Sequence, residues 1–432
     1  MKILLLAAIL LAAPAAAKLA PAEQRIVRTV DSEQARSVAL LERLVNQNSG
    51  SLNFPGVEAV GGMMRAELEP LGFTVRWVPM AQAGRAGHIV ATHKGSGRGK
   101  KMLLIGHLDT VFEPDSPFQR FTRKDGNIAE GPGVGDDKGG MVVMVAALRA
   151  MKAAGTLADA DIEIVLTGDE EDSGSPIELA RRDLIAAAGR TEIALDFEGL
   201  AQENGLDMGS IARRGSASWQ VTAKGRTGHS SGIFSEQMGN GAIYELARIL
   251  AAFRAELPEP NLTFNVGLVV GGATAELDRD LIRGTATGKT NIIPPIAIAR
   301  GDLRALSLEQ QQRVIAKMKD IVGRHLPGSE AELAFDEGGY PPMAPTPASR
   351  ALLGRLNAVN RDLGLAEMGE LDPLKRGAGD IGFVAHLIPG LVGLGTAGGG
   401  SHAPGETVDL SSIPRQAKRA AILMTRLSAG SR

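Results

Sequence analysis

The stretch that decides the fold is KMLLIGHLD, residues 101–109. Its apolar run from Met102 to Ile105 is typical of a buried strand, and the run ends at Gly106-His107. Positions two apart on a strand face the same way, so His107 can bind a metal while Asp109 orients its ring. Alone this pair is weak evidence, because a single histidine is more often a structural residue.

Around this stretch, segments with strand and helix patterns alternate. The patterns predict strands at residues 73–78, 88–93, 101–105, 162–167 and 192–197, and helices at 35–44, 57–71, 141–153, 349–363 and 413–427. Strands that alternate with helices favour an α/β sandwich with a largely parallel sheet.

The pattern changes in the middle of the chain. Strands at 218–223, 262–270, 296–304 and 331–335 and helices at 241–257 and 308–325 give the order β-α-β-β-α-β. That order is typical of a ferredoxin-like α+β module. We expect this module to occupy residues 213–326 as an insertion, so that residues 18–212 and 327–432 form one domain.

Composition limits the kinds of partner. The chain has 432 residues, with 47 Lys and Arg against 49 Asp and Glu. This near-balance gives no reason to expect nucleic acid or an anionic membrane as a partner. Since there is no cysteine, any bound metal must be held by His, Asp and Glu.

The first residues resemble an export signal. Lys2 precedes an apolar run from Ile3 to Ala13, and Ala15-Ala16-Ala17 follows Pro14. A charged start, a short apolar run and small residues at the end indicate a cleavable signal peptide, residues 1–17. The alternative is an uncleaved anchor. With cleavage, we expect a periplasmic or secreted protein that is free of the membrane.

Three further acidic motifs stand out. Residues 133–140 read GVGDDKGG before a predicted helix, residues 168–172 read GDEED after a predicted strand, and Asp196-Phe197-Glu198 ends another strand. Helix capping explains the first motif as well as metal binding does. A solvated acidic turn is the alternative for the second. The metal interpretation gives one Glu of this turn to the metal and its neighbour to general-base catalysis.

The motifs are more informative together, because each follows a strand or lies in a loop, and open α/β sheets form their sites at that edge. Five N and O ligands, one of them shared, suit two zinc-like ions. The candidate ligands are His107, Asp136, Glu171, Glu198 and His402, which lies in the glycine-rich run 398–405.

In this order the motifs resemble those of the dinuclear zinc peptidases that include glutamate carboxypeptidase, aminoacylase-1, acetylornithine deacetylase and succinyl-diaminopimelate desuccinylase. The resemblance is nearest to the glutamate carboxypeptidase branch. It implies a three-layer α/β/α catalytic domain with an inserted dimerisation (lid) domain. It also implies a homodimer and two Zn²⁺ ions, with Co²⁺ or Mn²⁺ as possible substitutes.

The resemblance also assigns roles to residues. Asp136 would bridge both ions, next to a cis peptide bond to Asp137. One ion would take His107 and Glu198, with Asp196 as the alternative to Glu198, and the other ion would take Glu171 and His402. Asp109 would orient His107, and Glu170 would be the general base. His229 would stabilise the oxyanion in the partner subunit's site, and Asn291 and Arg304 would contact a substrate carboxylate.

The implied activity is hydrolysis of an amide or peptide bond next to a small amino acid, carboxypeptidase-like or as an N-acyl-amino-acid amidohydrolase, through a water that bridges two zinc ions. The expected substrate is a small peptide or an N-acyl amino acid. An aminopeptidase or dipeptidase of the same family is the alternative, and a non-catalytic binding protein is a weaker one. A second arginine expected near residue 339 is absent, since residues 337–342 read EGGYPP. Specificity for a C-terminal glutamate therefore does not follow from the motifs.

Overall fold

The computed structural model describes residues 19–430, so the predicted signal peptide lies outside the described residues. The larger part of the molecule is built on a six-stranded sheet in the order β1, β2, β6, β3, β7, β19. These strands span Thr74–Pro79, Gly87–His93, Ile162–Thr167, Met102–His107, Ile193–Asp196 and Gly390–Val392. β2 runs antiparallel to both of its neighbours, while β6, β3, β7 and β19 pair in parallel. The sheet is therefore largely parallel, as predicted.

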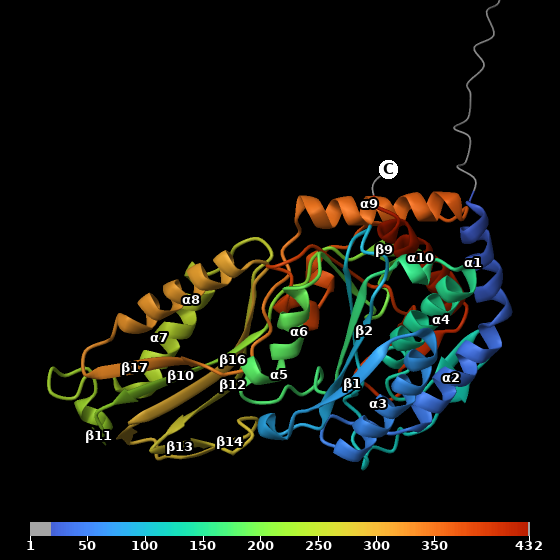
Figure 1. Ribbon diagram of the computed structural model, residues 1–432. Coiled ribbons are helices and arrows are strands. Elements are labelled where there is room, and N and C mark those ends of the chain that lie inside the picture. Colours follow the sequence, from blue (N-terminus) through green and yellow to red (C-terminus); the bar gives the residue numbers. More distant parts are fainter. Residues whose placement is uncertain (1–18, 431–432) are drawn as a thin grey trace, which may run out of the picture.

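Helices cover both faces of this sheet (Figure 1). Leu104 of β3 belongs to one buried cluster, and its neighbours Leu103 and Ile105 belong to another on the opposite face. This alternation is expected for a strand that is buried on both sides. The first cluster includes side chains of α1 (Pro21–Ser32), α2 (Gln34–Asn46), α3 (Phe54–Leu68), α4 (Lys138–Ala154), α9 (Pro347–Asp362) and α10 (Ser412–Ser428). The second includes α5 (Ile177–Ala180) and α6 (Arg182–Ala188). The three-layer α/β/α domain is confirmed.

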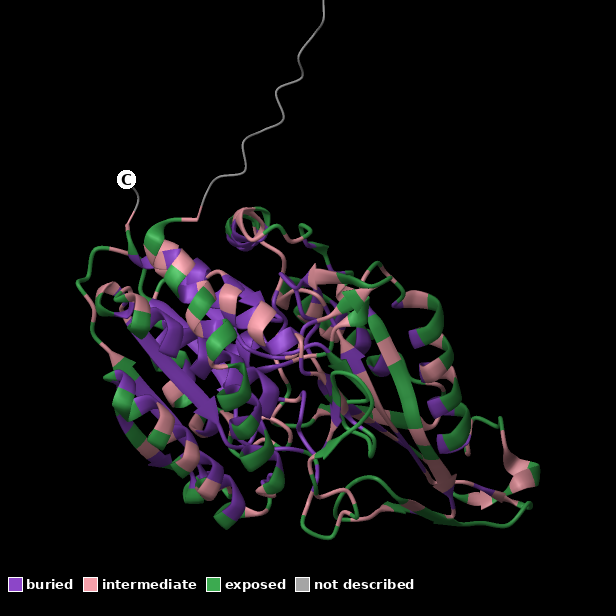
Figure 2. Cartoon of the chain, turned by 90° about the vertical axis from the view of Figure 1, so that its right-hand side faces the viewer, coloured by how far each residue is buried: buried purple, intermediate pink, exposed green. Residues whose placement is uncertain are grey.

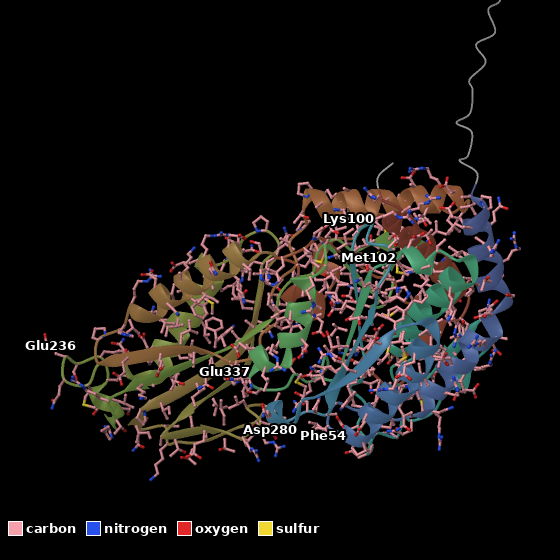
Figure 3. The ribbon with its side chains drawn as sticks, in the orientation of Figure 1. Phe54, Lys100, Met102, Glu236, Asp280 and Glu337 are labelled. Atoms are coloured by element: carbon pink, nitrogen blue, oxygen red, sulfur yellow. The ribbon has the colours of Figure 1, made fainter. Side chains whose placement is uncertain are left out.

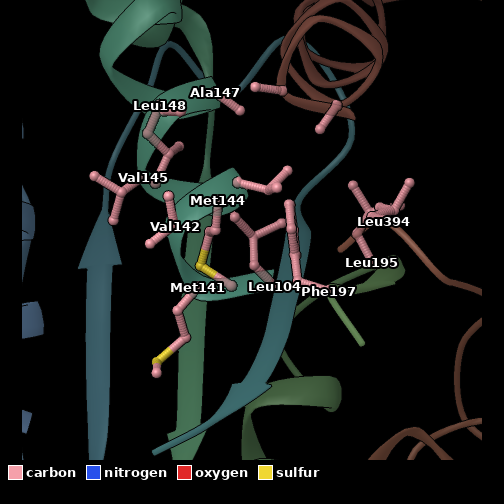
Figure 4. Close-up of a cluster of buried hydrophobic side chains, with 14 of the residues drawn as sticks. Leu104, Met141, Val142, Met144, Val145, Ala147, Leu148, Leu195, Phe197 and Leu394 are labelled. Atoms are coloured by element: carbon pink, nitrogen blue, oxygen red, sulfur yellow. The ribbon is translucent and has the colours of Figure 1, made fainter. Parts of the chain in front are cut away.

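Helix α4 forms the centre of the larger cluster, where Met141 and Met144 lie near Leu104 of β3 and Phe197 (Figure 4). A Cβ at Gly140 would overlap the Phe197 carbonyl oxygen. Only glycine lets the start of this helix approach the end of β7 so closely.

The inserted module is a separate antiparallel sheet in the order β12, β16, β10, β17, with two helices (Figure 1). Its elements are β10 (Ala217–Gly225), α7 (Gly241–Glu256), β12 (Thr263–Gly272), β16 (Ile296–Arg304), α8 (Leu308–Gly323) and β17 (Ser329–Phe335). The ferredoxin-like order is confirmed. Because β17 pairs with β10 as far as Phe335 opposite Trp219, the sheet continues beyond residue 326, where we predicted the module to end.

The shorter strands were not predicted. In the module, β11 (Gly228–His229) pairs with β15 (Ile292–Ile293), and β13 (Thr274–Leu277) pairs with β14 (Gly284–Thr287). Two further small sheets are formed by strands outside the main sheet. One has β4 (Thr122–Arg123), β5 (Ile128–Glu130), β20 (Gly398–Gly399) and β21 (Thr407–Asp409), and the other has β8 (Gln202–Glu203), β9 (Leu206–Gly209) and β18 (Gly369–Glu370).

Burial differs between the two parts (Figure 2). Buried residues fill the sheet and helices of the larger part, whereas the module's strands are mostly exposed or half-buried on one face. Edge strand β12 leaves Val269 56% exposed. Glu236, before α7, lies at the end of the module that is farthest from the larger part (Figure 3). Among residues 19–430, no helix combines the length and hydrophobicity needed to cross a membrane.

The two connections between the parts run side by side. Ser216 donates its N–H to the Tyr340 carbonyl at 2.9 Å, and Tyr340 donates its N–H to the Ser216 carbonyl at 2.8 Å. Arg213 and Met343 form a second bridge of the same kind. Glu337 lies where the chain returns from β17 to the larger part (Figure 3).

Candidate metal centre

Three parallel strands of the main sheet deliver the candidate ligands to one edge. β3 ends at His107, β6 ends at Thr167 just before the acidic turn, and β7 ends at Asp196 just before Glu198. Because β3 pairs in parallel with both β6 and β7, these ends meet at the same edge of the sheet.

Five side chains form two groups that share one carboxylate. His107, Asp136 and Glu198 form the first group, and Asp136, Glu171 and His402 form the second, with the ligand atoms of each group within 4.8 Å of one another. His107 Nε2 lies 3.0 Å from Asp136 Oδ1, and His402 Nε2 lies 3.2 Å from Asp136 Oδ2. Each oxygen of Asp136 therefore faces a different histidine. These are the five ligands proposed from the sequence.

The donor set fits two divalent cations. Imidazoles and carboxylates are the ligands zinc takes when no thiolate is present. Burial raises the pKa of Glu171 to about 7. Hydrogen bonds to Asp136 and Glu171 raise the pKa of His402 to about 11. The metal-free groups thus hold protons at sites where cations would neutralise the clustered acids.

The imidazole of His107 is oriented for metal binding. Its Nδ1 lies 3.1 Å from the Asp109 carbonyl oxygen and 3.4 Å from Asp109 Oδ1. Because both groups are acceptors, Nδ1 carries a proton and Nε2 faces the Asp136 carboxylate. The Asp109 carboxylate also accepts from Ser51 Oγ at 2.6 Å and from the N–H groups of Glu170 and Glu171, both at 3.0 Å. Asp109 thus joins β3 to the acidic turn.

A glutamate that the sequence analysis missed holds the loop of Asp136. Glu406 is 1% exposed. Its carboxylate accepts the N–H groups of Gly133 at 3.0 Å, Gly135 at 2.8 Å and Asp136 at 3.0 Å. The peptide bond from Asp136 to Asp137 is cis, as the resemblance implies.

Glu170 lies in a cavity of about 540 Å³ that Asp136, Glu171 and His402 also line. Burial raises the pKa of Glu170 well above its ordinary value. A carboxyl group beside the candidate ligands, with its pKa raised by burial, suits a general base.

The geometry favours Glu198 over Asp196 as a ligand. Glu198 belongs to the first ligand group and lines the cavity. Asp196 is fully buried behind it and accepts the Glu198 N–H at 3.2 Å. Asp196 therefore supports the backbone of Glu198.

Four cationic side chains line the same cavity: Arg213, Arg304, Lys375 and Arg376. Only Arg304 was predicted, and it is paired with Asp302 at 2.9 Å. Arg213 Nη1 lies 3.1 Å from Glu198 Oε1, and Arg376 Nη2 lies 3.7 Å from Glu198 Oε2. The sequence shows the basic pairs Arg213-Arg214 and Lys375-Arg376, but no local pattern predicts that they meet at this cavity. Tyr340, from the segment 337–342 that lacks the second arginine, also lines the cavity.

One chain does not bring His229 and Asn291 to this centre. Neither residue lines the cavity. His229 is exposed in β11, toward the far end of the module (Figure 1), and its Nδ1 lies 2.8 Å from Ser231 Oγ. Asn291 lies next to it, with its carbonyl accepting the Ser230 N–H at 3.0 Å. The role of His229 in a partner subunit's site stays a prediction.

With this geometry established, comparison with known proteins identifies the family. The model of "Peptidase family M20/M25/M40" matches residues 103–426, which include all five candidate ligands. The chain belongs to this family. It is an enzyme of the peptidase and amidohydrolase type, as the sequence predicted.

Individual M20 relatives cover most of the chain. Carboxypeptidase G2 of Pseudomonas sp. (strain RS-16) is 29% identical over 412 residues, 94% of this chain and 92% of the relative. Succinyl-diaminopimelate desuccinylase of Novosphingobium aromaticivorans is 28% identical over 403 residues, 89% of this chain and 97% of the relative. A tripeptidase structure from Staphylococcus aureus superposes with a TM-score of 0.73 at 19% identity, over 92% of this chain and 99% of that chain. The last likeness shows the M20 fold alone.

Proposed function

We propose that this protein is a dinuclear zinc amidohydrolase that cleaves the amide bond of a small N-acyl amino acid or peptide, with a carboxylate on the substrate. The observation that carries the proposal is the shared carboxylate of Asp136. It lies between two His and carboxylate pairs, with the half-buried Glu170 beside them.

In the proposed reaction, the chain's own residues position the water and move its proton. His107, Asp136 and Glu198 would hold one cation, and Asp136, Glu171 and His402 the other. The two cations would polarise the substrate carbonyl and lower the pKa of a water molecule. Glu170 accepts the proton of this water as its oxygen attacks the carbonyl carbon. Glu170 then delivers the proton to the nitrogen as the C–N bond breaks.

The cationic rim supports an anionic substrate. Arg213, Arg304, Lys375 and Arg376 all line the cavity, and a guanidinium binds a carboxylate through two parallel hydrogen bonds. Glu198 already takes up part of the charge of Arg213 and Arg376. Arg304 and Lys375 also have carboxylate partners, Asp302 and Glu203, but these pairs are part-exposed and lie outside the metal centre. Arg304 and Lys375 are therefore the proposed contacts for the substrate carboxylate.

A metal-loaded activity screen tests the proposal. The panel contains N-acetyl amino acids with acidic, basic and apolar side chains, and the matching dipeptides with free or blocked amino groups. We expect zinc-loaded protein to cleave N-blocked acidic members fastest. Preference for free-amine dipeptides would instead indicate an aminopeptidase or dipeptidase, and cleavage of none would refute the proposal.

A pair of variants isolates the proposed base. We expect Glu170→Gln to keep both metals, measured by elemental analysis, and to lose most turnover. Glu178→Gln makes the same change at an exposed glutamate on α5 and serves as the control. Full activity of Glu170→Gln would rule out its role.

We also propose a homodimer through the inserted module, in which His229 stabilises the oxyanion in the partner subunit's site. Exposed apolar residues on β12, including Val269, support an interface there. Mixing His229→Ala with Glu170→Gln subunits should restore up to about one quarter of wild-type activity, since one site of each hybrid dimer is intact. No recovery from two folded variants would argue against a shared site.

Export is proposed from the first residues alone. We expect expression of the full chain in a bacterium with a periplasm to give a protein that begins at Lys18, measured by N-terminal sequencing of the periplasmic fraction. A protein that retains Met1 would contradict this.

A further inference from the structure

Tyr340 reaches the acidic turn from the segment that follows the inserted module. Its hydroxyl lies 2.5 Å from the Glu170 carbonyl oxygen, 2.7 Å from Ser173 Oγ and 2.8 Å from Arg181 Nη2. One phenol thus contacts three groups around the proposed general base.

The chemistry of these partners fixes the direction of each hydrogen bond. A phenol has one proton to donate and two lone pairs that accept. The Glu170 carbonyl can only accept, so Tyr340 donates its proton there. The Arg181 guanidinium can only donate, so the Ser173 hydroxyl must donate as well. The Tyr340 hydroxyl then has neither a donor nor an acceptor site left for a hydrogen bond to a substrate.

Glu170 has no regular secondary structure to hold it. Residues 168–176 contain no helix or strand, so side chains must satisfy the backbone of this turn. The Glu170 N–H is held by Asp109 Oδ1 at 3.0 Å, and its carbonyl is held by Tyr340. The backbone of the base is therefore held on both sides, by Asp109 just after β3 and by Tyr340 just after the inserted module.

Tyr340 is itself held by a buried ion cluster. Arg181 is fully buried. Its Nε contacts Asp380 Oδ1 at 2.7 Å, its Nη1 contacts Asp169 Oδ1 at 2.6 Å, and its Nη2 contacts the Asp169 carbonyl at 2.9 Å. A buried guanidinium with its hydrogen bonds made cannot move without a large cost. The phenol therefore has a rigid anchor.

From these contacts we infer that Tyr340 is a positioning residue for the reaction: its hydroxyl, anchored by Arg181 and Ser173, fixes the backbone of Glu170 so that the carboxyl group faces the metal ligands. The inference rests on the proposed function of Glu170. It assigns to Tyr340 no contact with the substrate.

The substitution Tyr340→Phe tests this, since it removes the hydroxyl and keeps the ring. The ring would still pack against Phe383, at 5.2 Å between ring centroids. On the panel substrate that the wild-type protein cleaves fastest, we expect kcat to fall about 10- to 100-fold, as for a base displaced by a fraction of an ångström. KM should stay within about twofold and metal content should not change, because substrate and metal contacts are intact.

Two further variants keep the test decisive. Tyr244→Phe changes the only other tyrosine of the sequence, which is 52% exposed on α7, and we expect wild-type kinetics. Ser173→Ala removes one donor to Tyr340 and leaves Arg181 in place, so we expect a smaller loss of kcat, about 3- to 10-fold. If Tyr340→Phe does not fold, an unchanged kcat in Ser173→Ala would overturn the inference.

The outcomes separate this inference from the proposed function. A Tyr340→Phe protein with wild-type kcat and only a lower melting temperature would show a structural role and overturn the inference. A rise in KM at unchanged kcat would also overturn it, since Tyr340 would then act on substrate binding. If Glu170→Gln remained active, the proposed function itself would fail. If Glu170→Gln were inactive while Tyr340→Phe matched the wild type, only the inference would fail.

Discussion

Replacing Glu406 should show how far the candidate metal centre depends on the support of the Asp136 loop. The substitution Glu406→Ala removes the acceptor of three backbone N–H groups, from Gly133, Gly135 and Asp136. A hydrogen bond to a charged group contributes about 1.5–3 kcal/mol to stability. The three bonds do not add fully, because water can enter the vacated space and hydrate the freed N–H groups. We expect the free energy of unfolding to fall by about 3–5 kcal/mol.

The milder substitution Glu406→Gln gives a second magnitude. Oε1 accepts from Gly135 and Asp136, and Oε2 accepts from Gly133. If the glutamine amide keeps its oxygen at the Oε1 position, its NH₂ group faces the Gly133 N–H and that hydrogen bond is lost. The hydrogen bonds from Gly135 and Asp136 remain, but their acceptor is no longer charged. The expected cost is about 1–3 kcal/mol.

The assay is guanidinium unfolding of zinc-loaded protein, followed by circular dichroism and tryptophan fluorescence, with metal content measured on the same samples. Glu58→Ala, on the exposed face of α3, is the control and should match the wild type. We expect both Glu406 variants to bind metal more weakly, because Asp136 contributes to both ligand groups. If Glu406→Ala stayed within about 1 kcal/mol of the wild type and retained both metals, the loop would not depend on this carboxylate.

Three further predictions follow from the metal centre. Burial raises the pKa of Glu171 to about 7, and hydrogen bonds raise the pKa of His402 to about 11. Both protons must leave before metal binds. Zinc affinity should therefore rise between pH 5.5 and 8.5, by up to about tenfold per pH unit for each proton released. Chelator competition measures this, and an affinity independent of pH would contradict it. Glu198→Gln should lose about one of two metals while Asp196→Asn keeps both, and equal loss in the two variants would reverse the ligand assignment. Burial raises the pKa of Tyr340 well above its ordinary value, so alkaline titration at 295 nm should show a late tyrosine that Tyr340→Phe removes, whereas two tyrosines ionising together would argue against its burial.

The elements that carry the ligands could be predicted from the sequence because each has a local signal. The apolar run before His107 predicts a buried strand, and the acidic turn follows another strand directly. Parallel strands of one sheet end at one edge, so local signals were enough to bring His107 and Glu171 together. The parallel pairing of the strands is sufficient to bring these ends together, so no long-range contact had to be predicted.

The supporting residues had no such signal. Glu406 follows the glycine-rich run that contains His402, yet its partners are the N–H groups of Gly133, Gly135 and Asp136, at least 270 residues earlier in the sequence. Arg181 and Tyr340 meet only after the chain has passed through the whole module. Such contacts depend on how loops fold against one another, and hydrophobic periodicity does not encode loop packing. The predicted boundary at residue 326 left out the strand at 331–335, although the β-α-β-β-α-β order already counted this strand in the module, and β17 does pair with β10.

The paired connections at Ser216 and Tyr340 should allow the inserted module to be removed or replaced as a unit. Because the chain leaves and re-enters the larger part at hydrogen-bonded neighbours, a few residues can bridge the gap if the module is excised. Cuts placed after Ser216 and before Tyr340 would retain Arg213 and the clamp on Glu170 in the remaining domain. We expect that another domain whose two ends lie side by side can be grafted between these points, which would replace Arg304 and β12 while the candidate metal ligands stay in the larger part.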